Sequence, residues 1–472
     1  MIAGTLAFLV FLAVVLSVYH ALQWRTAKYG WLTLASWGFY AAASPGYLWV
    51  LLLLTLIDFV AAKRIAACEV PAIRKRWLLL SIVANLSLLA AFKYTVFATD
   101  NALSLMKWLG WMDNTRTWDL LLPLGISFHT FQGISYTVDV YRKKIEPVKS
   151  LPDYCLFVAF FPQLAAGPIV RAVEFLPQLV TPPRVTSAQV ADGLRLFAFG
   201  LFKKLVIADQ LHVLLVDPLF SHPELYDSSA LRLAALAWAV QIYCDFSGYS
   251  DLAVGTAKWF GFELPANFNL PYLATSISDF WRRWHVSLSS WLRDYLYFPL
   301  GGSRHGEWQT ARNLIILFVL CGLWHGAAWH WLAYGLFNGV LMVVHRQWDR
   351  AIGDRPWRQS VPWKLAAWLL TFTQLVVGLV LIRMESWAGG WRILGALVGW
   401  NLSGETFPIS FVLILLLCLG MMGHGVGLIE KLKAKIPAAL GDWTTGIATA
   451  LAMVGVVVLS PSAVKSFIYI AF

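Results

Sequence analysis

The sequence predicts an all-α, polytopic integral membrane protein. Of its 472 residues, 59% are hydrophobic and 13% are charged, whereas soluble domains carry roughly 25% charged residues. A soluble core could not bury so much apolar surface, so lipid must solvate a large part of it. The net charge of +11 and the 25 tryptophans agree with basic cytoplasmic loops and with aromatic belts at the membrane interfaces. Neither feature requires a nucleic-acid partner.

Apolar runs that alternate with basic loops predict about eleven or twelve crossings, with both chain ends outside. We interpret the first run, Met1–Tyr19, as a membrane span and not as a cleaved signal peptide. Arginines and lysines follow alternate runs, and the last such loop carries Lys431, Lys433 and Lys435. The later predicted crossings are residues 31–43, 47–62, 77–97, 120–140, 191–216, 231–249, 313–329, 330–344, 365–382, 407–427 and 445–459.

Several of these runs are shorter than the roughly 20 residues that a crossing needs. Residues 151–167, with Pro152, Pro162 and Gly167, indicate a re-entrant segment. Irregular backbone at membrane depth is tolerated only around protein or a water-filled cavity, so an internal pocket is expected. The longest non-crossing stretch is residues 258–312. We expect one membrane domain over residues 1–472. The five cysteines form no CxxC pair, so we expect neither a disulfide framework nor a thiolate metal site.

Residues 276–335 hold the most unusual chemistry. Their first half fits a helix capped by Ser276 or Ser278 and stopped at Pro299, in which His285 falls on the apolar face. The second half fits an apolar helix broken around residues 322–326. The glycines at 322 and 326 would let another helix approach closely.

Two of the ten histidines, His285 and His325, stand among tryptophans in these apolar segments. Ionisable groups in such a setting are costly and usually serve function; the alternative is a histidine hydrogen-bonded between helices. His129 also falls in a predicted span. The chain has no HExxH, GxSxG, Walker or GxGxxG motif, so we expect no metal and no bound cofactor. What remains is a histidine base acting on a hydroxyl, which suits acyl transfer from an activated thioester.

Charged residues flank the histidine motifs. Arginines on the predicted cytoplasmic side fit a phosphate-bearing donor, although the positive-inside rule alone also explains them. Acidic and amide side chains between residues 245 and 294 are expected to order the pocket, or to form hydrogen bonds with the backbone at a helix break after residue 249. The candidates for donor binding are Arg282, Arg283, Arg293 and Trp324, and the candidates for a structural or pocket role are Asp245, Asp251, Asn269 and Asp294.

Five runs in a fixed order carry a family resemblance. They read LPLGISFHTFQGISYTVDVYR, FVAFFPQLAAGPIVR, DFSGYSDLAVGTAKWFGFELPANFNLPY, SISDFWRRWHVSLSSWLRDYLYFPLGG and LCGLWHGAAWHWLAYG, and they fall within residues 121–335. This pattern resembles the membrane-bound O-acyltransferase (MBOAT) family, in particular its bacterial branch that includes the membrane subunit of alginate O-acetylation.

The resemblance implies a ring of transmembrane helices around a thinned centre with a tunnel. It implies that His325 of the WHG motif is catalytic and that His285 of the WRRWH motif is a second functional position. The donor would be acetyl-coenzyme A from the cytoplasm. The acetyl group would reach an extracytoplasmic polysaccharide through a partner acetyltransferase, across a bacterial inner membrane.

The sequence is also compatible with two alternatives. A transporter or flippase for a lipid-linked or anionic solute would also have broken helices, internal histidines and a pocket. An acyltransferase could instead act on a lipid, a teichoic-acid carrier or a protein.

Overall fold

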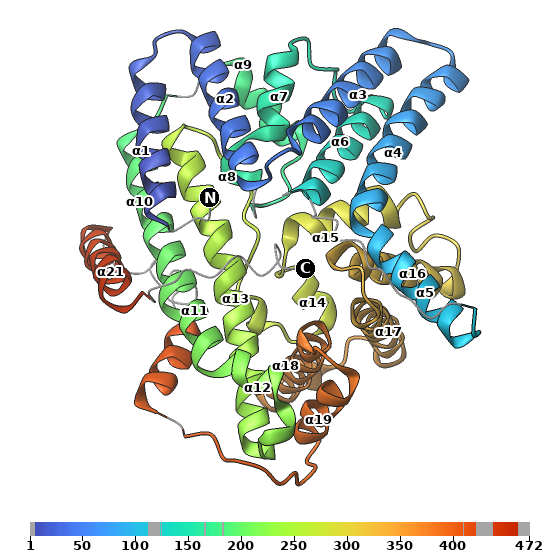
Figure 1. Ribbon diagram of the computed structural model, residues 1–472, viewed down its shortest axis with the longest axis vertical. Helices are drawn as coiled ribbons and strands as arrows, with labels where there is room; N and C mark the ends of the chain where they lie inside the picture. Colours follow the sequence, from blue (N-terminus) through green and yellow to red (C-terminus); the bar gives the residue numbers. More distant parts are fainter. Residues whose placement is uncertain are drawn as a thin grey trace.

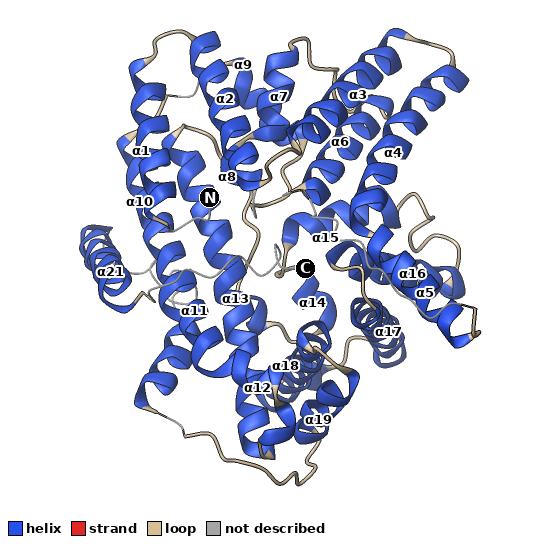
Figure 2. Cartoon of the chain, in the orientation of Figure 1, coloured by secondary structure: helices blue, strands red, loops and turns tan. Residues whose placement is uncertain are grey.

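The computed structural model describes residues 5–111, 123, 125–164, 167–181, 184–408, 410–421 and 438–460. Within these ranges the chain is helical and contains no β-strand (Figure 2). The predicted basic loop with Lys431, Lys433 and Lys435 lies outside the described residues, as does the start of the predicted crossing at 120–140. The all-α prediction is therefore confirmed for the described part of the chain.

The helices before the histidine motifs mostly start near the predicted runs. Their bounds are α1 Leu6–Ala21, α2 Arg25–Ala43, α3 Leu48–Ala67, α4 Pro71–Lys93, α5 Thr95–Trp108, α6 Ile126–Tyr141, α7 Leu151–Ala159, α8 Phe161–Leu164, α9 Ala172–Val180, α10 Ser187–Leu201, π-helix η1 Phe202–Ala208, α11 Asp209–Leu211, π-helix η2 His212–Val216, α12 Asp217–Ser221, η3 Pro223–Leu225 and α13 Ser228–Trp259. The predicted re-entrant segment is divided between the short, largely buried α7 and α8.

The helices that carry or follow the motifs are shorter and more broken. Their bounds are η4 Pro271–Leu273, α14 Ile277–Trp281, α15 Val286–Leu292, π-helix η5 Arg293–Tyr297, α16 Glu307–His325, α17 Trp329–Ile352, η6 Pro356–Gln359, α18 Val361–Arg383, α19 Trp387–Leu397 and α21 Ala438–Leu459. A further apolar helix spans Phe411–Met421.

The short helices α14 and α15 lie near the middle of the molecule, with longer helices around them (Figure 1). In that view α10 and α13 stand on one side and α16 and α17 on the other, while α18 and α19 lie below. One hydrophobic core joins α13 to α14, α18 and α19, and a second joins α1–α3 to α7–α9. A smaller cluster holds Phe131, Trp291 and Trp324 together beside α15. The segment with the histidine motifs is thus enclosed by the rest of the chain.

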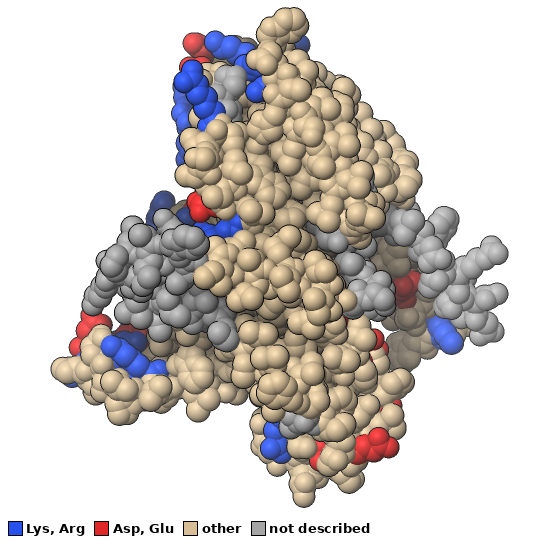
Figure 3. Space-filling view, turned by 90° about the vertical axis from the view of Figure 1, so that its left-hand side faces the viewer, with Lys and Arg blue, Asp and Glu red and all other residues tan. Residues whose placement is uncertain are grey.

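The outer surface suits a lipid environment. Two of the described helices, α4 and α18, are long and apolar enough to cross a membrane. Large apolar side chains such as Leu6, Val10 and Leu194 project outward from α1 and α10. On the face shown in Figure 3, Lys, Arg, Asp and Glu gather mainly toward the margins, and broad areas between them carry no charged side chain.

Candidate functional site

The chain between α14 and α15 leaves the helical path at His285. Ser276 caps α14 as predicted, since its Oγ accepts from the N–H of Asp279 at 3.1 Å. The prediction of one continuous helix is wrong, however, because His285 adopts a left-handed backbone with φ of 45°. That conformation costs a non-glycine residue roughly 1–2 kcal/mol. The break takes His285 off the helix face that the periodicity assigned to it.

Asn267 stabilises this break and orients the His285 ring. Its Oδ1 accepts from His285 Nδ1 at 3.1 Å, from the backbone N–H of Ser287 at 3.3 Å and from the Ser287 hydroxyl at 2.9 Å. A backbone N–H can only donate, so this Asn267 atom is the carbonyl oxygen and Nδ1 of His285 carries the hydrogen. The basic nitrogen of His285 is therefore Nε2. Burial lowers the pKa of His285 to about 3, so the ring is neutral at physiological pH.

His325 is the last residue of α16, and the predicted break beyond it is confirmed. A side chain on Gly322 would collide with the Trp331 carbonyl and one on Gly326 with the Trp331 indole. The close helix approach expected at these glycines is therefore present, between α16 and α17. The Trp331 indole stacks on the His325 ring with centroids 5.3 Å apart.

The fold brings the two histidines together. The ring centroids of His285 and His325 lie 6.4 Å apart, and the residues are 0% and 6% exposed. Aromatic rings enclose the pair: Phe246 lies edge-on to His285 at 4.7 Å, and Trp324 lies 4.8 Å from His325. A neutral histidine in such a dry shell can accept a proton from a hydroxyl and return it, which is the chemistry of a general base.

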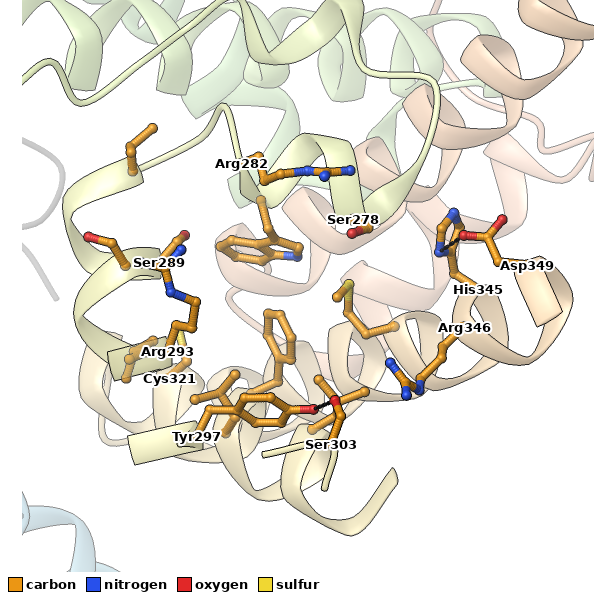
Figure 4. A pocket seen from close by; sticks show the side chains of 18 of the residues that line it. Ser278, Arg282, Ser289, Arg293, Tyr297, Ser303, Cys321, His345, Arg346 and Asp349 are labelled. Atoms are coloured by element: carbon orange, nitrogen blue, oxygen red, sulfur yellow. Dashed lines mark hydrogen bonds and ion pairs between the residues drawn. The ribbon is translucent and has the colours of Figure 1, made fainter. Parts of the chain in front are cut away.

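A cavity of about 550 Å³ is lined by side chains of α14, α15, α16 and α17 (Figure 4). It reaches Cys321, one helical turn before His325 on α16. Its polar lining residues are Ser278, Arg282, Ser289, Ser290, Arg293, Tyr297, Ser303, His345, Arg346, Asp349 and Arg350. A second hollow of about 850 Å³ shares Ser278 and Arg282 with it and adds Arg355, Arg358 and Lys364. Together the two hollows combine apolar side chains such as Phe318 and Met342 with the arginines and the lysine named above.

Only two of the four donor-binding candidates lie at the cavity. Arg282 and Arg293 line the cavity. Arg283 does not belong to its lining and pairs with Asp279 at 2.9 Å, one helical turn away. Trp324 packs on Phe131, with ring centroids 5.1 Å apart, and contributes to the shell around the histidines.

Asp294 of η5 supports the cavity wall by pairing with Arg293, which lines the cavity. It pairs with Arg171 at 2.7 Å and with Arg293 at 2.8 Å. Asn269 uses its backbone, since its N–H donates to the Arg283 carbonyl at 2.9 Å. These contacts hold the loop before α14 and the helix after α15 in place.

The expected helix break near Asp245 and Asp251 is absent, because α13 continues through both residues to Trp259. Neighbouring backbone on α10 and η1 packs tightly there, and the two carboxylates meet lysines of η1. Asp245 pairs with Lys204 at 2.7 Å and Asp251 with Lys203 at 2.6 Å. Lys204, 1% exposed at its side chain, also pairs with Asp209. Asp245 and Asp251 therefore join α13 to η1.

Several residues of the site were not identified as such from the sequence. Asn267 belongs to a loop that the sequence indicates to be irregular and hydrogen-bonding, without linking it to His285. Arg346 and Arg350 match the positive-inside rule. Lys93, whose ammonium donates to the backbone carbonyl of His325 at 3.0 Å, lies about 230 residues from it along the chain, and no local pattern links them. His129 is buried on α6 beside Leu54 of α3 and belongs to a different region from the histidine pair. Among the described residues no group of three His, Cys, Asp or Glu side chains could hold a metal ion.

Comparisons with known proteins identify relatives of this chain. The chain is 38% identical to the peptidoglycan O-acetyltransferase of Helicobacter pylori over 397 residues, which cover 79% of this chain and 74% of the relative. It is 39% identical to the probable alginate O-acetylase AlgI of Pseudomonas aeruginosa, over 83% of this chain and 74% of the relative. The teichoic acid D-alanyltransferase of Bacillus subtilis is 29% identical over 54% of this chain and 67% of the relative.

Residues 144–382 match the model of the MBOAT, membrane-bound O-acyltransferase family. The matched region contains both histidines, Asn267 and every cationic residue of the two hollows. The expectation of an acyltransferase is confirmed, and the transporter alternative finds no counterpart among these relatives. This chain belongs to the membrane-bound O-acyltransferase family and is an acyltransferase of the membrane.

Proposed function

We propose that this protein transfers an acetyl group from cytoplasmic acetyl-coenzyme A toward hydroxyls of an extracytoplasmic polysaccharide. The observation that carries the proposal is the buried pair of His285 and His325, with ring centroids 6.4 Å apart, together with an arginine-lined cavity that reaches Cys321, one helical turn before His325. The relatives of highest identity named above are O-acetyltransferases of peptidoglycan and alginate, which favours a polysaccharide over a lipid or protein acceptor. The setting is a bacterial inner membrane, with residues 1–472 as one membrane domain crossed about eleven or twelve times around a tunnel.

His325 acts as the general base in this proposal. It takes the proton from the acceptor hydroxyl while the oxygen attacks the acetyl carbon. The bond between that carbon and sulfur then breaks, and the coenzyme A thiolate leaves and receives the proton from His325. No net proton is consumed. His285 assists by holding a neutral ring beside His325, in an orientation set by Asn267.

The donor has a suitable place in the two hollows. The apolar wall formed by Trp281, Phe318 and Met342 fits the thioester arm, and the arginines fit its phosphates. Because the cavity reaches Cys321, a thioester that enters past Arg282 would approach the last turn of α16, which bears His325. An extracytoplasmic partner acetyltransferase would pass the acetyl group to the polymer.

The test uses purified protein in nanodiscs with acetyl-coenzyme A labelled on the acetyl carbon. Alginate oligosaccharides and soluble peptidoglycan fragments serve as acceptors in parallel. We expect the wild type to release coenzyme A, and to label one acceptor once the partner acetyltransferase is added. His325→Ala should lose ~10²–10⁴-fold in the rate of coenzyme A release, the share of a positioned base. His330→Ala is the matched control on the next helix. Equal rates for His325→Ala and the wild type would overturn the assignment of the base.

A further inference from the structure

The C-terminal end of α16 is held by residues from the far N-terminal part of the chain. The last carbonyls of any α-helix lack partners within the helix. Here Lys93 Nζ donates to the carbonyls of Trp324 and His325, the latter at 3.0 Å. The Tyr94 hydroxyl donates to the carbonyl of Leu323 at 2.8 Å. Three successive carbonyls ending at His325 are thus bound by two successive side chains.

The chemistry of this contact suits its place. A helix C-terminus is the negative end of the helix dipole, and a lysine there is favourable by electrostatics as well as by hydrogen bonding. Lys93 and Tyr94 are only partly exposed, so water competes weakly for these bonds. An ammonium group in an apolar environment needs such partners, because leaving it unpaired there is costly.

The same segment also contacts the first turn of α17. Asn101 of α5 accepts from the Trp329 indole N–H at 2.9 Å, and Phe97 packs on the Trp329 ring with centroids 5.7 Å apart. Residues 326–328, which join α16 to α17, therefore lie between two attachments to α4 and α5. The attachment on the α16 side ends directly at the backbone of His325.

We propose that Lys93 and Tyr94 are positioning residues for acyl transfer. They fix the last turn of α16 so that the His325 ring stays beside His285 and faces the thioester. The inference rests on the proposed role of His325 as the base. It predicts that losing the Lys93 ammonium lowers kcat and leaves donor binding intact, because Lys93 does not line either hollow.

The experiment measures kcat and the KM for acetyl-coenzyme A in nanodiscs, per mole of folded protein. Lys93→Met keeps the length of the side chain and removes its charge and donors. We expect it to lower kcat ~10²-fold, as an error of about 1 Å in a reacting group does, with KM within about twofold of wild type. Lys93→Arg should recover much of the rate, and Tyr94→Phe should lose about tenfold, as one hydrogen bond is worth.

Lys107→Met on the exposed end of α5 is the control and should match the wild type. The proposal is overturned if Lys93→Met keeps the wild-type kcat, or if its loss appears only in the amount of folded protein or in KM. His325→Ala is assayed alongside. If that variant is fully active, the proposed base is wrong; if it is inactive while Lys93→Met is normal, only the positioning role fails.

Discussion

Gly326→Ala should slow the enzyme by moving an aromatic ring and not by removing a polar group. A methyl carbon at Gly326 would overlap Cδ1 and Nε1 of the Trp331 indole and lie 2.8 Å from its Cε2. Carbon atoms pack at about 3.5–4.0 Å, so the indole and the loop must move apart by at least ~1.5 Å between them. Trp331 is 2% exposed and has little free space. Gly326 has a φ of −156°, which any residue can adopt, so only the collision opposes alanine.

The size of the effect follows from the contact between Trp331 and His325. Overpacking of this kind costs about 1–3 kcal/mol of stability, which a well-folded protein tolerates. The indole stacks on the His325 ring, so a ~1 Å shift is passed to the proposed base and should lower kcat ~10²-fold.

A double-mutant cycle with Trp331→Ala gives the decisive assay. Coenzyme A release is measured for wild type, Gly326→Ala, Trp331→Ala and the double variant, with Gly38→Ala as a control because its methyl would meet no atom within 4 Å. Gly326→Ala should cost little once the indole is gone, so the two effects should be strongly non-additive. Simple additivity, or a Gly326→Ala variant with normal kcat, would refute the reasoning.

Three further predictions concern the walls and supports of the site. Arg282→Gln should raise the KM for acetyl-coenzyme A by ~10–100-fold, the value of one charged hydrogen bond. Arg283 is already paired with Asp279 outside the cavity, so Arg283→Gln should leave KM unchanged. Equal effects of the two substitutions would count against a phosphate contact at Arg282. Burial lowers the pKa of His285 to about 3, so below pH ~6.5 the unfolded chain binds a proton on that residue that the native protein excludes. The free energy of unfolding should therefore fall as the pH drops from ~6.5 toward 3. In thermal unfolding, the melting temperature of His285→Asn should depend less steeply on pH than that of the wild type. Lys204→Met should lower the free energy of unfolding by ~3–5 kcal/mol, because it removes the cation that pairs with buried carboxylates. Adding Asp245→Asn should restore part of the lost stability, measured as the yield of monodisperse protein. A normal yield of Lys204→Met alone would contradict this.

The helical architecture follows from composition, and much of the order of elements follows from the alternation of apolar runs and basic loops. The predicted break after His325 and the close approach at Gly322 are local consequences of small residues, so the sequence shows them. Helix ends are less well predicted. The run at 231–249 predicts a helix that ends ten residues before the end of α13, because Asp245 and Asp251 look unfavourable in a membrane until Lys203 and Lys204 are known to face them.

The pairing of the two histidines depends on contacts that have no signal in local periodicity. Within residues 276–298 every spacing agrees with one continuous helix, which would have kept His285 in register with Leu288 and Leu292. The left-handed turn at His285 becomes stable only when Asn267, eighteen residues earlier, accepts three hydrogen bonds around it.

The same reasoning applies to His325, whose carbonyl is bound by Lys93 from α4. Both rings are placed by a polar side chain distant in sequence that bonds the backbone or ring of the histidine segment. Which side chains bind the histidine segment depends on tertiary packing. A single sequence therefore indicates the candidate reactive histidines by residue type, whereas the residues that orient them are identified only from the fold. It follows that substitutions at Asn267 and Lys93 should affect turnover more than donor affinity, as losses confined to the transition state do.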